Sequence, residues 1–267
     1  MSLIAFDFDG VILDSSREKA LIGLLGYREI SPETRLYSGN ELCMESCNAA
    51  FNLHPAEFDS FIRLLQFSGN IAGWDIVNYA LIDRAPHTTF LSLEEYLDAK
   101  QQFLPLSNDE LKQSYRRQRL KIIHHPRYRE LCPLFPGIKE QLRALQESAT
   151  LVICTTKARD MVDRIVGFHG LDCFDRIYSG EDKHAMLREA CDTYNTPMNE
   201  LVFIEDFADN LKPFLPLGVR TLFARYGQGG AIQHAISEQL GIPTIDSPTD
   251  LADAILLQLR SGIAVVR

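Results

Sequence analysis

The sequence predicts an α/β fold, in which a doubly wound parallel sheet carries an inserted all-helical domain. In residues 1–13 and from residue 134 onwards, short apolar runs typical of buried strands alternate with helical patterns. Between about 15 and 134 the helical patterns continue without a clear strand. We therefore expect a core domain of residues 1–16 and 134–267 and a helical domain of residues 17–133, inserted after the first strand.

Four apolar runs are expected to form the main strands of the core, and a fifth, weaker candidate lies between the second and third of them. In chain order the four are Leu3–Phe8, Leu151–Cys154, Leu201–Ile204 and Val219–Phe223, and the weaker one is Ile177-Tyr178. Helical patterns fill the gaps at Ile138–Gln146, Arg159–Phe168, His184–Tyr194, Leu211–Leu215 and Leu251–Leu259.

Six helices are expected in the inserted domain, and Pro32, Pro55, Pro86, Pro105 and Pro126 punctuate them. They are Arg17–Leu25, Glu41–Phe51, Ala56–Gln66, Trp74–Ile82, Leu93–Phe103 and Asp109–Ile123. We expect its large aromatic residues to build the core of this domain, among them Phe61, Phe67, Trp74 and Tyr79.

Composition excludes several classes of partner. The net charge of -9 and the pI near 5.3 argue against non-specific binding to nucleic acid, which needs a basic face. No apolar stretch approaches the roughly 20 residues of a membrane span, and residues 1–13 lack the pattern of a signal peptide. We expect a cytoplasmic protein that does not bind membranes. A local cationic pocket still permits a small phosphorylated substrate.

Polar residues stand where the predicted strands end. They are Asp7 and Asp9, Thr155, and the pair Glu205-Asp206. In open α/β sheets, ligands bind outside the carboxyl ends of the strands, so we expect these side chains to converge.

Asp7 and Asp9 are one residue apart, so on an extended strand their side chains face the same way. Two carboxylates at this spacing repel each other unless a cation neutralises them. Mg²⁺ binds such oxygen-rich sites and keeps coordination positions for substrate phosphate. The alternative is a turn with solvated acidic side chains.

The segment Asp7–Ser15, DFDGVILDS, resembles the first motif of the haloacid dehalogenase-like hydrolase superfamily. Thr155, Lys183 and Glu205-Asp206 follow in the order of the second, third and fourth motifs. The resemblance covers about 1–16 and 134–230. It implies a Rossmann-like core with a helical cap, in the branch that contains phosphatases and phosphomutases.

The resemblance implies a role for each motif residue. Asp7 would attack phosphorus and become an aspartyl phosphate, while Asp9 would act as general acid and then as general base. Thr155 would donate its hydroxyl to a phosphoryl oxygen, and Lys183 would supply positive charge. Mg²⁺ would be bound by Asp7, Glu205, Asp206 and the Asp9 backbone carbonyl, the last by family analogy.

Some positions leave alternatives open. Thr155 can instead cap the following helix. Lys157, at the end of the second strand, competes with Lys183 as the phosphate-binding lysine. Thr156 is a candidate substrate-binding residue, although many relatives have Asn there. The commonest fourth motif has Asp four residues after the aspartate that corresponds to Asp206, and this chain has Asn210.

An acid at Asp9 favours phosphoester chemistry, because a halide leaving group needs no proton. The leading interpretation is a phosphoric monoester hydrolase that acts on a small phosphorylated metabolite. The alternatives are a sugar-phosphate mutase and a catalytically weak module for binding or regulation. In the helical domain, Arg63 and Arg119 are the candidates to bind a substrate anion, and the alternative for each is a solvated surface position.

Overall fold

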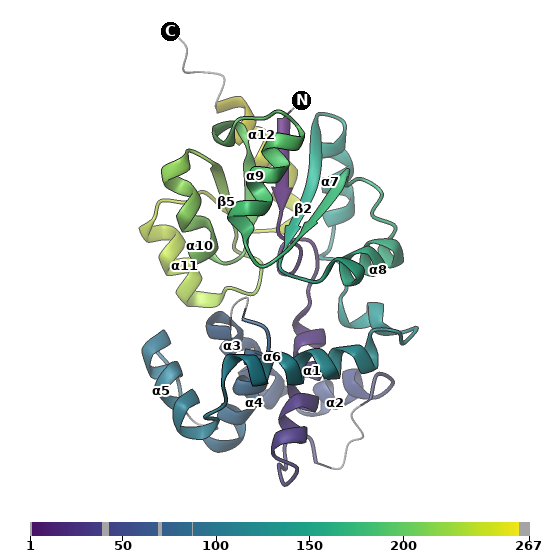
Figure 1. Cartoon of the computed structure of the whole chain (residues 1–267), viewed down its shortest axis with the longest axis vertical. Coiled ribbons are helices and arrows are strands. Elements are labelled where there is room, and N and C mark those ends of the chain that lie inside the picture. The colour runs from purple at the N-terminus through teal and green to yellow at the C-terminus, as the bar shows by residue number, and fades with distance from the viewer. Residues whose placement is uncertain (1, 39–42, 69–70, 87, 262–267) are drawn as a thin grey trace. The chain divides into compact units, whose positions relative to one another are not determined.

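The computed structural model describes residues 2–38, 43–68, 71–86 and 88–261. The chain folds into two compact units, one of Met1–Asp14 with Pro133–Arg267 and one of Ser15–Cys132 (Figure 1). We call them the α/β unit and the helical unit. No helix in the described ranges has the length and apolar character of a membrane-spanning segment.

Six parallel strands form the sheet of the α/β unit, in the order β3-β2-β1-β4-β5-β6. The strands are β1 Ser2–Phe6, β2 Ala149–Thr155, β3 Arg176–Ser179, β4 Val202–Glu205, β5 Arg220–Ala224 and β6 Thr244–Ile245. The expected doubly wound parallel fold is therefore confirmed. Strand β6 was not expected, because two residues are too few to produce an apolar run.

Helices connect the strands of this unit. They are α7 Ile138–Gln146, α8 Arg159–His169, α9 Lys183–Thr193, α10 Ala208–Leu211, α11 Gly230–Gln239 and α12 Leu251–Ser261, with short 3₁₀ turns at Met198–Glu200, Lys212–Leu217 and Pro248–Asp250. The expected helix Leu211–Leu215 is wrong in its bounds, since α10 begins earlier and a 3₁₀ turn follows it. Pro213 and Pro216 lack the backbone N–H groups that an α-helix would use there.

Two apolar layers enclose the sheet. Leu3 and Ala5 of β1 belong to a buried cluster that includes Met186 and Leu187 of α9. Alternate residues of a strand face opposite sides, so Ile4 points to the other face. There α7 packs on β2, and α12 packs on β4 and on α7. Burial on both faces explains why the strands are continuous apolar runs, and it leaves the carboxyl ends of the strands to carry the polar residues.

The described residues of the helical unit form seven helical segments. They are α1 Ser16–Ile30, α2 Cys47–Leu53, α3 Pro55–Ser68, α4 Trp74–Arg84, α5 Leu93–Phe103, α6 Asn108–Ile122 and the 3₁₀ turn Tyr128–Leu131. The expected helix Glu41–Phe51 is wrong at its start. Residues 41–42 lie outside the described ranges, and 43–46 form turns. The Ser46 hydroxyl accepts from the Cys43 backbone N–H, a local bond that competes with helix formation.

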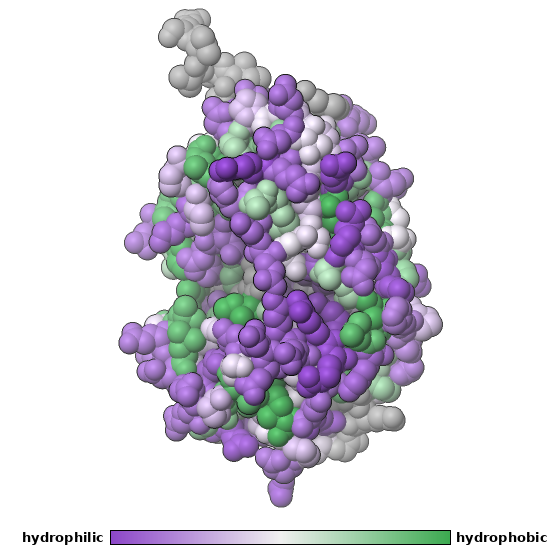
Figure 2. Space-filling view, in the orientation of Figure 1, coloured by the Kyte–Doolittle hydropathy of each residue, from purple (hydrophilic) through white to green (hydrophobic). Residues whose placement is uncertain are grey.

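Aromatic side chains fill the interior of the helical unit. Phe61 stacks on Tyr79 with ring centroids 4.9 Å apart, and Phe67 stacks on Tyr96 at 5.0 Å. Trp74 is 5% exposed, and its indole N–H donates to Asn108. The expectation that these aromatic residues build a core is confirmed. Hydrophilic residues cover most of the face shown in Figure 2, where apolar residues form separate groups.

Candidate active site

Asp7 follows β1 directly and is 3% exposed. Its backbone N–H donates to the Ile204 carbonyl at 2.9 Å, which ties the end of β1 to β4. The chain then turns tightly, with the Gly10 N–H donating to the Leu13 carbonyl at 2.9 Å. Gly10 has φ +85, a left-handed conformation that favours glycine. The turn therefore keeps Asp7 and Asp9 at the edge of the sheet.

Lys183 is the first residue of α9 and lies between two carboxylates. Its Nζ is 3.0 Å from Asp7 Oδ1 and 2.7 Å from Glu205 Oε2. A lysine at a helix N-terminus opposes the helix dipole, so these two acidic side chains supply the compensating charge. Burial would lower the pKa of Lys183, but Asp7 and Glu205 outweigh it and raise the pKa above the ordinary value. Lys183 is therefore a permanent cation in this site.

Burial is the main cause that raises the pKa of Asp7, to about 7. The Glu205 carboxylate adds to the rise, and Lys183 opposes it. Burial also raises the pKa of Glu205, again against Lys183 and with a further contribution from Asp206. Ionising these carboxyl groups together would therefore place more negative charge in a small buried space than Lys183 alone neutralises.

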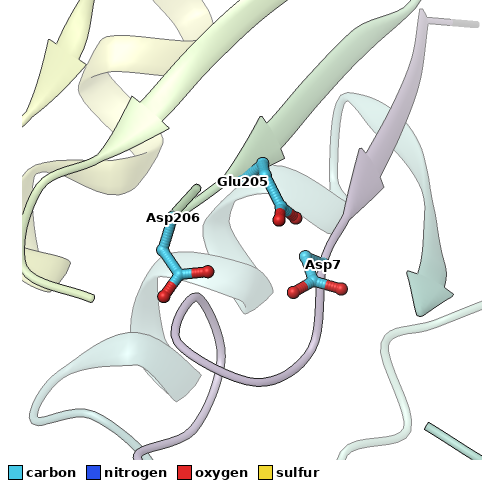
Figure 3. A group of neighbouring side chains, drawn as sticks. All are labelled: Asp7, Glu205 and Asp206. Carbon is cyan, nitrogen blue, oxygen red and sulfur yellow. The ribbon is translucent and has the colours of Figure 1, made fainter. Parts of the chain in front are cut away.

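Asp7, Glu205 and Asp206 form a buried acidic group whose ligand oxygens all lie within 4.8 Å of one another. Figure 3 shows Glu205 pointing toward Asp7, with Asp206 directly after it beside the turn that Asp7 begins. An all-oxygen set with excess negative charge fits a hard divalent cation such as Mg²⁺. The sequence-predicted residues at the ends of β1 and β4 are thus brought together.

Asp9 is paired with a second lysine. Lys157 Nζ lies 2.9 Å from Asp9 Oδ1 and 3.1 Å from Oδ2, and the lysine side chain is 1% exposed. Lys157 and Lys183, which the sequence left as competing candidates, both occupy the site. Lys157 contacts Asp9, and Lys183 contacts Asp7 and Glu205.

Thr155 ends β2 and is 2% exposed. Its hydroxyl oxygen accepts from the Lys157 backbone N–H at 3.1 Å. Helix α8 begins at Arg159, and the side chain of its N-cap residue, Ala158, makes no capping hydrogen bond. The alternative that Thr155 caps this helix is therefore wrong. The neighbouring Thr156 is exposed.

A family model described as haloacid dehalogenase-like hydrolase matches residues 1–218. The chain belongs to the haloacid dehalogenase-like hydrolase family. The match includes residues of both units.

Solved structures of haloacid dehalogenase-like proteins have the same fold. A family hydrolase from Streptococcus pneumoniae is 17% identical with a TM-score of 0.62, over 96% of this chain and 98% of that one. A predicted phosphoglycolate phosphatase from Haemophilus somnus is 16% identical with a TM-score of 0.60, over 96% and 98%. A β-phosphoglucomutase from Clostridium difficile is 14% identical with a TM-score of 0.52, over 98% and 99%. A search of curated proteins finds no significant match.

Asn210 holds Glu205 in this haloacid dehalogenase-like site. Its side-chain amide donates to Glu205 Oε1, while Lys183 donates to Oε2. Both oxygens of Glu205 thus have a partner from the protein. The commonest fourth motif has Asp at this position. In this chain Asn210 stands there, and its side chain contacts Glu205.

Sequence reasoning missed the segment Tyr226–Gln233, which lies between β5 and the first turn of α11. The Gln228 backbone N–H donates to Asp206 Oδ2 at 2.7 Å. The Gln233 side chain is hydrogen-bonded to Asp209. The single Gly227 and the pair Gly229-Gly230 were the only signal in the sequence, and they are equally typical of an ordinary loop.

Arg63 and Arg119, the two candidates for binding a substrate anion, have different partners within the helical unit. Arg63 is exposed on α3 and donates to the Ser60 hydroxyl at 2.8 Å. Arg119 Nε lies 3.1 Å from Oε1 of Glu18, whose side chain is fully buried, and the guanidinium also donates to the Tyr115 hydroxyl. Tyr128 donates to the same Glu18 carboxylate. Arg119 therefore compensates a buried charge, and Arg63 does not.

Proposed function

We propose that this protein is a phosphatase that hydrolyses a small phosphorylated metabolite through an aspartyl phosphate on Asp7. The supporting observation is the arrangement around Asp7. It pairs with the buried Lys183 and shares a 4.8 Å group with Glu205 and Asp206, while Asp9 stands two residues away. A nucleophile, an acid–base residue, a cation and a metal-ligand set are what phosphoryl transfer through an enzyme carboxylate requires.

In the first half of the proposed reaction, an Asp7 oxygen forms a bond to phosphorus as the bond to the leaving oxygen breaks. The leaving oxygen takes a proton from the Asp9 carboxyl group. The products of this half are the alcohol and an acyl phosphate on Asp7. Lys157, bound to both oxygens of Asp9, orients that carboxyl group.

In the second half, Asp9 acts as a base. It takes a proton from a water molecule that attacks phosphorus, and the bond between phosphorus and the Asp7 oxygen breaks. Inorganic phosphate leaves, and Asp7 returns as a carboxylate. Each proton that Asp9 gives to the leaving group is thus recovered from water.

Lys183 and Thr155 are proposed to stabilise the transferring group. The Lys183 ammonium stands 3.0 Å from the nucleophile, where negative charge accumulates in the transition state. The Thr155 hydroxyl accepts from Lys157 N–H, so its own proton is available to donate to a phosphoryl oxygen. The exposed Thr156 is proposed to contact the phosphoryl group beside it.

Mg²⁺ is the proposed cofactor, and Asp7, Asp206, Glu205 and the Asp9 backbone carbonyl would hold it. When bound, it offsets the negative charge of the carboxylates and of the substrate phosphate. Asp206 is the strongest candidate ligand after Asp7, because Glu205 already uses one oxygen for Lys183 and the other for Asn210.

The proposed substrate is a small phosphorylated metabolite. The acidic composition disfavours nucleic acid, and two of the structures with this fold are named a predicted phosphoglycolate phosphatase and a β-phosphoglucomutase. In the helical unit, Arg63 is the better candidate for a substrate anion, because Arg119 already pairs with Glu18.

Phosphate release from p-nitrophenyl phosphate and from a panel of phosphorylated metabolites tests this function. We expect release with Mg²⁺, none after EDTA, and none from a folded Asp7→Asn variant. Undiminished release by Asp7→Asn would remove Asp7 as nucleophile. A coupled assay for interconversion of sugar 1- and 6-phosphates tests the mutase alternative.

A further inference from the structure

The segment Tyr226–Gln233 encloses Asp206 on several sides, although it lies about 20 residues further along the chain. We propose that this segment is a clamp that positions the Asp206 carboxylate for Mg²⁺. The proposal rests on the proposed function, because it concerns the same metal site. It assigns a task to residues outside the motifs by which the chain resembles its family.

Close approach explains the glycines of the clamp. A Cβ atom added at Gly227 would lie 2.3 Å from Asp206 Cβ and 2.5 Å from the Gly10 carbonyl oxygen. One added at Gly229 would lie 2.2 Å from the Asp206 carbonyl oxygen. Neither glycine has a left-handed φ, so the backbone conformation alone does not require glycine at these two positions. Glycine is required there because a side chain at either position would overlap Asp206.

A hydrogen bond fixes the Asp206 carboxylate itself. The Gln228 backbone N–H donates to Asp206 Oδ2 at 2.7 Å, and Asp206 is 1% exposed. A charge-assisted bond of this length holds the plane of the carboxyl group in one orientation. Gly10 approaches the same carboxylate from the turn after Asp7, where an added Cβ would meet Oδ2 at 1.9 Å. Asp206 therefore has little freedom to turn away from Asp7.

Both ends of the clamp are anchored. At one end, the Tyr226 hydroxyl donates to the Val11 carbonyl at 2.9 Å. At the other, Gln233 Oε1 accepts from the Asp209 backbone N–H and Gln233 Nε2 donates to Asp209 Oδ2, each at 3.1 Å. Gln233 is 4% exposed, so water does not compete strongly for these bonds. The clamp thus joins the Asp7 turn to the segment that follows β4.

Metal ligands held by a second layer of contacts bind more tightly, because less ordering is left to the moment of binding. Loss of such a contact typically weakens metal affinity by about 10- to 100-fold. We expect the same of this clamp, with the affinity for the metal changed more than the chemistry at saturating metal. Raising the Mg²⁺ concentration should therefore restore phosphate release in a clamp variant.

The test is titration calorimetry of the full-length protein with Mg²⁺ alone. Gly227→Ala should raise the Kd for Mg²⁺ by about 10- to 100-fold. The matched control is Gly167→Ala on α8, where an added Cβ meets nothing within 4 Å and the Kd should not change. A folded Gly227→Ala protein with the wild-type Kd would overturn the clamp.

A second variant decides the matter if Gly227→Ala does not fold. Gln233→Leu keeps the side-chain volume but removes both bonds to Asp209, and we expect a Kd raised about 10-fold. Its control is Gln239→Leu, the same change at an exposed position of α11. An unchanged Kd in Gln233→Leu would overturn the clamp while leaving the phosphatase proposal intact. Wild-type protein that binds no Mg²⁺ would instead overturn the metal site of the proposed function.

Discussion

Lys157 holds Asp9 through both carboxylate oxygens, at 2.9 Å from Oδ1 and 3.1 Å from Oδ2. The lysine side chain is 1% exposed and that of Asp9 is 18% exposed. A buried cation thus fixes an acidic side chain that still reaches solvent. In the proposed reaction, this is the side chain that exchanges protons with substrate and water.

Lys157→Met should lower kcat for phosphate release at least about 10-fold, because Asp9 loses its orientation. Lys183→Met should lower kcat further, since it removes the charge beside Asp7, the proposed nucleophile. Steady-state kinetics with p-nitrophenyl phosphate measures both. Arg188→Met, a cation-removing change at an exposed position of α9, is the control and should keep wild-type kcat. Wild-type kcat in Lys157→Met would exclude a role for the Lys157–Asp9 ion pair in phosphate release.

Asp9→Asn separates proton transfer from metal binding. The amide neither donates the proton that the leaving oxygen needs nor accepts one from water, so kcat should fall by about 10²- to 10⁴-fold. The backbone carbonyl of residue 9 is unchanged, so the Kd for Mg²⁺ in calorimetry should stay within about threefold. A large loss of Mg²⁺ affinity would mean that the Asp9 side chain itself binds the metal.

Asp75 makes the stability of the helical unit depend on pH. Burial raises its pKa to about 6 from 3.8, and Glu18 adds to this while Lys19 and Arg119 oppose it. The folded state therefore binds more protons than the unfolded state between these values. The associated stability is present below about pH 4 and is lost as the pH rises through about 6, by about 3 kcal/mol.

Asp75→Asn removes this titration. Urea unfolding should show the variant gaining about 3 kcal/mol relative to wild type between about pH 4 and about pH 8. The control is Asp98→Asn, an exposed aspartate on α5. Equal pH profiles for wild type and Asp75→Asn would show that Asp75 is ionised in the fold at no cost.

Arg119→Met tests whether this arginine is mainly structural. Glu18 has no exposed side-chain surface, and the substitution removes a cation 3.1 Å from its carboxylate while the neutral Tyr128 stays in contact with it. The free energy of unfolding should fall by about 3 kcal/mol. Arg63→Met, at an exposed site, should leave stability unchanged and raise KM if Arg63 contacts the substrate. An unaltered unfolding curve for Arg119→Met would contradict a structural role and make Arg119 a candidate again for binding the substrate anion.

The sequence was sufficient to predict the parallel fold and the convergence of Asp7, Glu205 and Asp206. These predictions use local information: an apolar run marks a buried strand, and parallel strands end at the same edge. The sequence could not predict which acidic residue each of Lys157 and Lys183 contacts, because each lysine stands at the start of a segment that can reach the site. Only the path of the chain between strands assigns one to Asp9 and the other to Asp7.

Other features could not be predicted because they depend on distant residues. Gln228 uses its backbone N–H, which every residue except proline possesses, to bind an aspartate 22 positions earlier. Glu18 reads as an ordinary charge in the first turn of a helix, yet its partners Arg119 and Tyr128 come from the far end of the helical unit. Contacts between residues so far apart in the sequence depend on how the whole chain packs, and no local sequence pattern predicts them.

Trapping of the Asp7 intermediate tests the central claim most directly. Borohydride reduces an aspartyl phosphate to homoserine, which mass spectrometry detects in the peptide that contains residue 7. Protein quenched during turnover with Mg²⁺ and substrate should carry homoserine at position 7, and protein quenched without substrate should not. Homoserine at another carboxylate, or phosphate release by Asp7→Asn at the wild-type rate, would contradict a covalent role for Asp7.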